Sequence, residues 1–205
     1  TWQLENWPGE DFPVVLKARD GAGSSFVVLC RDRQSLDSIR EKELPAAPGQ
    51  ILVQEFVTGH VVSVAFLIGP KQVLPLLPGR QQLSSDGRFQ YLGGEIPLPS
   101  EMRERAICLG LQAIQAVPGL AGYVGVDLVL GSAPDGSRDW AIEINPRLTT
   151  SYVGLRALCK GNLAGVLGQI LSGDQEIQVS WRTAEVTFRP AGELVLREIK
   201  RGFLE

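Results

Sequence analysis

The chain has 205 residues, of which 44% are hydrophobic and 21% are charged, so it can bury the core of one large domain or two small lobes. Its net charge of −3, and a sequence without an apolar run long enough to span a bilayer, favour neither a nucleic-acid partner nor a membrane partner. The three cysteines, Cys30, Cys108 and Cys159, are widely spaced in apolar contexts, which predicts reduced core residues in a cytoplasmic protein.

A glycine- and serine-rich loop between two short apolar runs is the first feature with a chemical interpretation. Residues 12–17 and 26–30 predict two strands. The small residues of the loop between them are Gly21, Ala22, Gly23, Ser24 and Ser25. Glycines let successive N–H groups point at an anion, although such a loop is more often a plain turn. Lys17 ends the first strand and favours phosphate binding, but without Gly-Lys-Ser/Thr and a following helix this is not a Walker A motif.

The next stretch predicts one helix and two strands. A helix is expected over residues 32–43 with Asp32 as its N-cap. An apolar strand over 51–57 follows, and Thr58-Gly59 separates it from a second apolar strand over 61–68.

The middle of the chain predicts two further strands and the longest helix. The strands are expected over 71–78 and 88–96, with a polar loop over 79–87 between them. The helix is expected over 100–116 with Ser100 as its N-cap and one apolar stripe.

Two adjacent strands carry the residues with the clearest chemistry. Apolar residues alternate over 122–130 and over 140–145, and the stretch between them has the composition of a hairpin loop. Asp127 interrupts the first strand on the face opposite its apolar neighbours, and Glu143 and Asn145 share a face of the second. If the strands pair, three oxygen ligands meet on one sheet face, as a hard divalent cation such as Mg²⁺ requires. The alternative is the solvated face of a two-stranded ribbon.

The residues after this hairpin add a fixed cation and a group of hydroxyls. Arg147 follows Asn145 through Pro146. A helix is expected over 149–159, and its early hydroxyls, Thr150 or Ser151, serve either as a cap or in substrate contact. The remaining expected elements are a helix over 162–171 and strands over 177–180, 184–188 and 194–199.

An Asp on one strand and Glu-x-Asn on the next, followed by an Arg, resemble the metal ligands of the ATP-grasp family. The resemblance extends over nearly the whole chain, and the run 145–155 is similar to the tyramine–glutamate ligase branch of methanofuran biosynthesis. It implies an α+β, ATP-grasp fold with two lobes of mixed and antiparallel sheet and a nucleotide cleft between them. The smaller lobe is expected over 1–57, incomplete at its N-terminus, and the larger, with the metal site, over 58–205.

The resemblance also implies the reaction and the residues that serve it. The expected activity is ATP-dependent carboxylate–amine ligation through an acyl phosphate, with ATP and Mg²⁺ (or Mn²⁺) as cofactors. The implied metal ligands are Asp127, Glu143 and Asn145. The implied catalytic residues are Lys17 and Arg147. The implied nucleotide-binding residues are Lys17, Gly21, Ala22, Gly23, Ser24, Ser25, Gln54, Glu55, Phe56 and Val57. The expected partners are a small-molecule carboxylate and amine, and a homo-oligomer is an open alternative to a monomer.

Two departures from the family pattern keep other functions open. Val61 stands where the family commonly has a glutamate that binds the ribose. The chain begins with Thr rather than Met and lacks the family's preceding α/β domain, so we expect a fragment that is inactive by itself. One alternative is a nucleotide-binding module without catalysis, and another is a structural α+β domain with a coincidental acidic face.

Overall fold

The computed structural model describes residues 1–19, 26–44 and 50–199, so the predicted phosphate loop Gly21–Ser25 lies outside the described residues. The chain forms two compact units. The first unit comprises Thr1–Val57 and Leu83–Tyr91, and the second comprises Thr58–Gln82 and Leu92–Glu205. The predicted larger lobe included residues 83–91, whereas these residues pack with the first unit.

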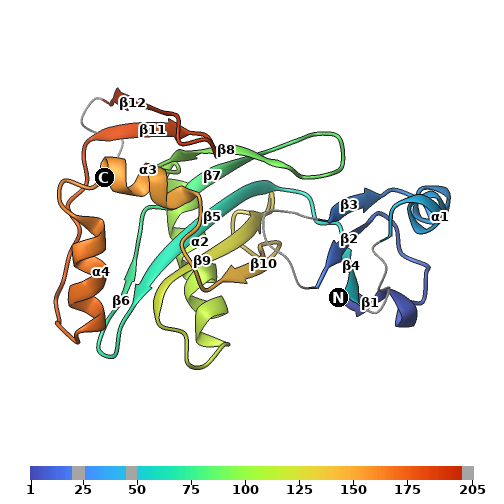
Figure 1. The fold of residues 1–205 in the computed structure, drawn as a ribbon, viewed down its shortest axis with the longest axis horizontal. Coiled ribbons are helices and arrows are strands. Elements are labelled where there is room, and N and C mark those ends of the chain that lie inside the picture. Colours follow the sequence, from blue (N-terminus) through green and yellow to red (C-terminus); the bar gives the residue numbers. More distant parts are fainter. Residues whose placement is uncertain (20–25, 45–49, 200–205) are drawn as a thin grey trace. The chain divides into compact units, whose positions relative to one another are not determined.

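The first unit is built on an antiparallel sheet with strand order β1-β4-β2-β3 (Figure 1). Its elements are β1 (Trp2–Gln3), η1 (Leu4–Asn6), β2 (Val14–Ala18), β3 (Val27–Cys30), α1 (Arg33–Lys42) and β4 (Ile51–Glu55). Asp32 caps α1 as predicted, because its carboxylate accepts the Ser35 N–H at 2.8 Å in a capping box. Leu16, Leu36 and Val53 are among the fully buried residues of this unit's core.

The second unit is built on a larger sheet with strand order β10-β9-β5-β7-β8-β11-β12, and β6 pairs with β5 (Figure 1). Its strands are β5 (His60–Ile68), β6 (Val73–Pro75), β7 (Gly79–Leu83), β8 (Tyr91–Ile96), β9 (Gly122–Leu130), β10 (Trp140–Asn145), β11 (Ala184–Phe188) and β12 (Leu194–Glu198). Its helices are α2 (Ser100–Gln115), α3 (Ser151–Leu158) and α4 (Leu163–Leu171).

The core of the second unit lies between α2 and the two longest strands, β5 and β9. Alternate residues of these strands, including Val64, Phe66 and Val126, are fully buried there. Gly110 lets α2 approach closely, because an added Cβ would lie 2.5 Å from Val64 Cγ1. The apolar alternation that predicted β9 is therefore the pattern that buries it.

Several local predictions are wrong, each for an identifiable reason. Gly79–Leu83 forms β7 rather than a loop, because pairing with β5 and β8 places a polar sequence inside the sheet. Ser100 does not cap α2, since the helix begins at Ser100 itself and Pro99 precedes it. Residues 177–180 form no strand. None of the helices in the described ranges is both long and apolar enough to cross a membrane.

The three cysteines differ in exposure, which corrects the prediction that all three are core residues. Cys30 and Cys159 are buried, but Cys108 is exposed on α2. Burial raises the pKa of the Cys30 thiol to about 11, so this group stays protonated and unreactive at physiological pH.

Iodoacetamide at mildly alkaline pH should therefore modify Cys108 well before Cys30 and Cys159 in native protein, and all three cysteines at similar rates in guanidinium. Mass spectrometry of the labelled peptides measures the order, and early labelling of Cys30 would contradict the structure.

A charged pair fixes the loop between β9 and β10. The Arg105 guanidinium on α2 donates from Nε to Asp139 Oδ2 at 3.0 Å and from Nη2 to Oδ1 at 2.5 Å. Asp139 also accepts the Gly131 N–H at 2.9 Å, and its side chain is only 5% exposed. The hydrogen bonds that Arg105 donates to Asp139 raise the pKa of Arg105. The hairpin is thus tied to α2 by a bidentate, charge-assisted contact.

Asp139→Ala should lower the free energy of unfolding by about 2 kcal/mol, less than a fully buried pair costs, because Arg105 keeps partial access to water. Urea unfolding of the second unit measures the change. Asp135→Ala removes a carboxylate of the same loop that accepts hydrogen bonds from Ser137 and acts on Arg105 through its charge, so it controls for the loss of a negative charge near Arg105. Equal shifts in the two variants would show that the pair contributes nothing specific.

Candidate active site

Strands β9 and β10 pair antiparallel and place Asp127 directly opposite Glu143. Side chains of directly opposed residues leave the same face of a sheet, so the two carboxylates share one face. The pairing shifts by one residue between Ala141 and Glu143, and Ile142 is the extra residue of this bulge. The regular alternation expected over 140–145 is therefore wrong at its start: Trp140 and Ile142 are exposed rather than buried.

Asn145 links this carboxylate pair to the arginine that follows it. Asn145 is 6% exposed, and its Nδ2 donates to Asp127 Oδ2 at 3.0 Å. Its Oδ1 accepts from Arg147 Nη2 at 3.0 Å. Gly125 lies directly opposite Asn145, so the amide reaches Asp127 diagonally across the two strands. The structure thus brings four of the predicted site residues, Asp127, Glu143, Asn145 and Arg147, into one cluster.

Gln81 on β7 is a further member of this cluster that the sequence did not indicate. Its Nε2 donates to Asp127 Oδ1 at 2.7 Å, so both oxygens of this carboxylate accept a hydrogen bond from a side-chain amide. The residue lay in a polar run interpreted as a loop. Gln81 and Gln82 are adjacent, so in a strand they leave opposite faces, and Gln82 Nε2 donates to Glu95 instead. This alternation is the one signal in the sequence that could have found Gln81.

The donor set fits a hard divalent cation. Two carboxylates and an amide oxygen are the ligand types that Mg²⁺ and Mn²⁺ prefer. Each carboxylate or amide oxygen that accepts one of the hydrogen bonds above keeps a second lone pair for a metal. Within the described ranges, no three or more His, Cys, Asp or Glu side chains cluster as a metal site, and a metal at this cluster would take the amide oxygen of Asn145 as a third ligand beside the two carboxylates.

The predicted nucleotide-binding residues that the structure describes belong to the first unit. Lys17 lies in β2 opposite Leu52. Of residues 54–57, the first two are the last residues of β4 and the other two follow the strand. The Phe56 N–H donates to the Pro13 carbonyl of the same unit at 3.1 Å. The Phe56 ring stacks on Phe89, with centroids 6.1 Å apart. Val61, at the position of the expected ribose ligand, lies in β5 opposite Val129.

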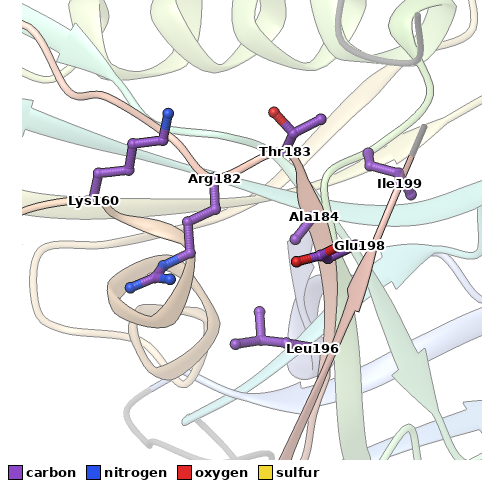
Figure 2. Close-up of a pocket in the computed structure, with 7 residues that line it drawn as sticks. All are labelled: Lys160, Arg182, Thr183, Ala184, Leu196, Glu198 and Ile199. Atoms are coloured by element: carbon purple, nitrogen blue, oxygen red, sulfur yellow. The ribbon is translucent and has the colours of Figure 1, made fainter. Parts of the chain in front are cut away.

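A separate cavity of about 770 Å³ opens beside β11 and β12 (Figure 2). Its lining residues are Lys160, Arg182, Thr183, Ala184, Leu196, Glu198 and Ile199. None of the predicted site residues is among them. Figure 2 shows the charged ends of Lys160 and Arg182 pointing in different directions, so they do not converge on one anion.

Gln81→Leu tests whether the donor to Asp127 matters to a metal. Loss of this hydrogen bond should weaken the Mg²⁺ dependence of nucleotide binding by roughly tenfold, the usual cost of removing a partner that orients a metal ligand. Calorimetric titration of nucleotide into the full-length protein, with and without Mg²⁺, measures it. Gln82→Leu, the adjacent residue with a different partner, is the control, and a similar loss there would point to a general effect on β7.

The fold and the carboxylate–amide–arginine cluster define a protein of the ATP-grasp class, and the comparisons with known proteins agree. The model of the ATP-grasp domain family matches residues 1–151. The chain belongs to the ATP-grasp family, which confirms the predicted fold class and the resemblance.

Individual proteins of known sequence or structure are also similar to the chain. The chain is 35% identical over 142 residues to a tyramine–L-glutamate ligase of Methanocaldococcus fervens, a match that covers 69% of this chain and 40% of that protein. An L-amino acid ligase from Bacillus licheniformis has the same fold, with a TM-score of 0.70 and 20% identity over 90% of this chain and 46% of its own. The biotin carboxylase domain of Hydrogenobacter thermophilus 2-oxoglutarate carboxylase, in complex with MgADP, gives a TM-score of 0.67 and 19% identity over 86% of this chain and 41% of its own.

Proposed function

We propose that this chain is part of an ATP-dependent carboxylate–amine ligase. The observation that carries the proposal is the pairing of Asp127 with Glu143, joined through Asn145 to Arg147 by hydrogen bonds of 3.0 Å. A solvated ribbon face would not require a buried amide between a carboxylate and a guanidinium. The similarity to a ligase over 142 residues supports the same class. The chain spans 40% of that relative's length, so the activity is proposed for the protein that contains it.

Asp127, Glu143 and Asn145 would hold Mg²⁺ or Mn²⁺. The bound cation would supply charge neutralisation for the ATP phosphates. Asp127 is the central ligand of the proposal, because Gln81 and Asn145 fix both of its oxygens in position. Lys17 and the N–H groups of Gly21–Ser25 would contact the phosphates, and residues 54–57 the adenine.

The proposed reaction has two steps. A carboxylate oxygen of the acid attacks the γ-phosphorus of ATP, and the bond from that phosphorus to ADP breaks, which gives an acyl phosphate and ADP. The amine nitrogen then attacks the acyl carbon and loses a proton, and phosphate leaves. Arg147 would orient the carboxylate and stabilise the oxyanion of the second step, because a guanidinium binds planar anions in a bidentate manner.

ADP release by the full-length protein tests the proposal. Glutamate and tyramine are the first substrates to use, because a similar protein is a tyramine–L-glutamate ligase. Hydroxylamine in place of tyramine should trap the acyl phosphate as a hydroxamate. Release of ADP that needs both an acid and Mg²⁺ supports the ligase, and nucleotide binding without ADP release under any substrate pair would remove it.

A nucleotide-binding module without catalysis is the second candidate. It is favoured by Val61, an apolar residue where the family commonly places a ribose ligand. The same ADP-release measurement separates the two functions.

A further inference from the structure

Three hydroxyl groups form a closed triangle beside the turn that carries Arg147. Tyr123 Oη lies 3.1 Å from Thr149 Oγ1 and 3.2 Å from Ser151 Oγ, and these two oxygens are 2.8 Å apart. Each hydroxyl can donate one hydrogen bond and accept another, so three hydroxyls satisfy one another around the triangle. Tyr123 is 5% exposed, and burial is the main reason that the pKa of its phenol is raised.

The hydroxyls of Thr149 and Ser151 do not cap the helix that follows. No side chain caps α3 at Thr150, and the first N–H groups of the helix find backbone acceptors instead. Tyr152 N–H donates to the Thr149 carbonyl at 3.0 Å, and Val153 N–H donates to the Thr150 carbonyl at 3.1 Å. Thr150 makes no side-chain cap hydrogen bond, and the Ser151 hydroxyl bonds to Tyr123 and Thr149 instead, so the prediction that the Thr150 or Ser151 hydroxyl caps this helix is wrong.

The triangle fixes one end of the Arg147 turn to β9. Thr149 also packs its methyl group against the bare backbone of Gly125, where an added Cβ would lie 2.6 Å from Thr149 Cγ2. Gly125 pairs with Asn145, so the turn is anchored to the same strand at both of its ends. Arg147 lies between the anchors and is itself exposed.

Both the backbone and the side chain of Arg147 form hydrogen bonds with backbone carbonyls of the same turn. The Arg147 N–H donates to the Asn145 carbonyl at 2.8 Å, and Nη1 approaches the Leu148 carbonyl at 3.4 Å. Because the Arg147 guanidinium is bonded to its own turn, its direction depends on the conformation of that turn. The buried Tyr123 phenol on β9 holds the turn in this conformation through Thr149 and Ser151.

The geometry assigns Tyr123 the role of a positioning residue, which holds the Arg147 turn through Thr149 and Ser151 and so aims the guanidinium at the acceptor carboxylate. This inference rests on the proposed function of Arg147. Tyr123 itself does not touch the substrate in this assignment.

Amide hydrogen exchange of the full-length protein, followed by mass spectrometry of peptides spanning residues 146–150, tests the anchor without any activity. Tyr123→Phe keeps the ring and removes one hydroxyl, so exchange in these peptides should rise about fivefold, the effect of one lost hydrogen bond. Thr149→Val, which keeps the methyl contact with Gly125, should act similarly. Tyr152→Phe removes a hydroxyl from the neighbouring ring outside the triangle and is the control. Unchanged exchange in Tyr123→Phe, or the same rise in the control, would overturn the inference.

A double-mutant cycle tests the route through Arg147. With glutamate and tyramine as probes, Tyr123→Phe should lower kcat about tenfold at unchanged ATP affinity, and should have no further effect in an Arg147→Ala background. A full effect in that background would overturn the assignment. If the wild type releases no ADP with any acid, the proposed function fails, and the exchange measurement still decides whether Tyr123 anchors the turn.

Discussion

Glu143→Gln should abolish the Mg²⁺-dependent part of ATP binding and phosphoryl transfer in the full-length protein. The substitution removes one negative charge with almost no change of shape, and it leaves Asp127 paired with a neutral amide across the strands. A direct metal ligand should matter more than a residue that only orients a ligand, so the loss should exceed the roughly 10- to 100-fold that removing such an orienting residue costs. The fold should survive, because Glu143 is only half-buried and β10 is an edge strand of its sheet.

Nucleotide affinity by calorimetry, with and without Mg²⁺, measures this effect. Glu104→Gln, an exposed carboxylate on α2, is the matched control and should change stability by no more than about 0.5 kcal/mol. Equal Mg²⁺ dependence in wild type and Glu143→Gln would eliminate the metal site, and with it the main support for a ligase.

Arg147→Lys should lower kcat roughly 100-fold or more, with little change in ATP affinity, because loss of one oxyanion donor has an effect of this size. The guanidinium donates from separate nitrogens to Asn145 Oδ1 and to the Leu148 carbonyl, and still has donors for a substrate. A lysine ammonium keeps the charge but is a point donor that cannot reproduce this fork.

The measurement is kcat for ADP release together with the ATP dissociation constant. Arg156→Lys, an exposed arginine on α3, makes the same chemical change away from the cluster and should be silent. A large rise in the ATP dissociation constant with kcat preserved would instead move Arg147 to the nucleotide side of the reaction.

The sequence predicted the elements that are determined by the pattern of their own residues. The alternating residues of β9 define the core of the second unit, and the same alternation isolates Asp127 on the other face. Asp32 predicted the start of α1, because its cap involves Ser35, only three residues further along the chain. The family resemblance rested on Asp127, on Glu143 and Asn145 in the next strand, and on the arginine that follows them, and the ATP-grasp fold is confirmed.

The remainder depends on contacts that are distant in sequence. Gln81 is 46 residues from Asp127, and its polar neighbours gave no reason to expect a strand. The bulge at Ile142 is set by pairing between β9 and β10, which a periodic pattern in one strand cannot reveal. The Ser151 hydroxyl matches a helix cap in sequence, but it forms a hydrogen bond with Tyr123, 28 residues away, instead.

The return of Leu83–Tyr91 to the first unit has a consequence for the order in which the chain is synthesised. Leu29 N–H donates to the Gly87 carbonyl at 2.8 Å, and Arg88 forms an ion pair with Glu43, 45 residues earlier. Strands β5, β6 and β7 of the second unit therefore leave the ribosome before the first unit has received its last segment. Closing a loop of this length costs entropy that must be met before the contacts form, so the first unit cannot finish folding independently as a nascent domain. A truncation after Val57 removes these contacts, and its stability does not represent that of the first unit in the intact chain.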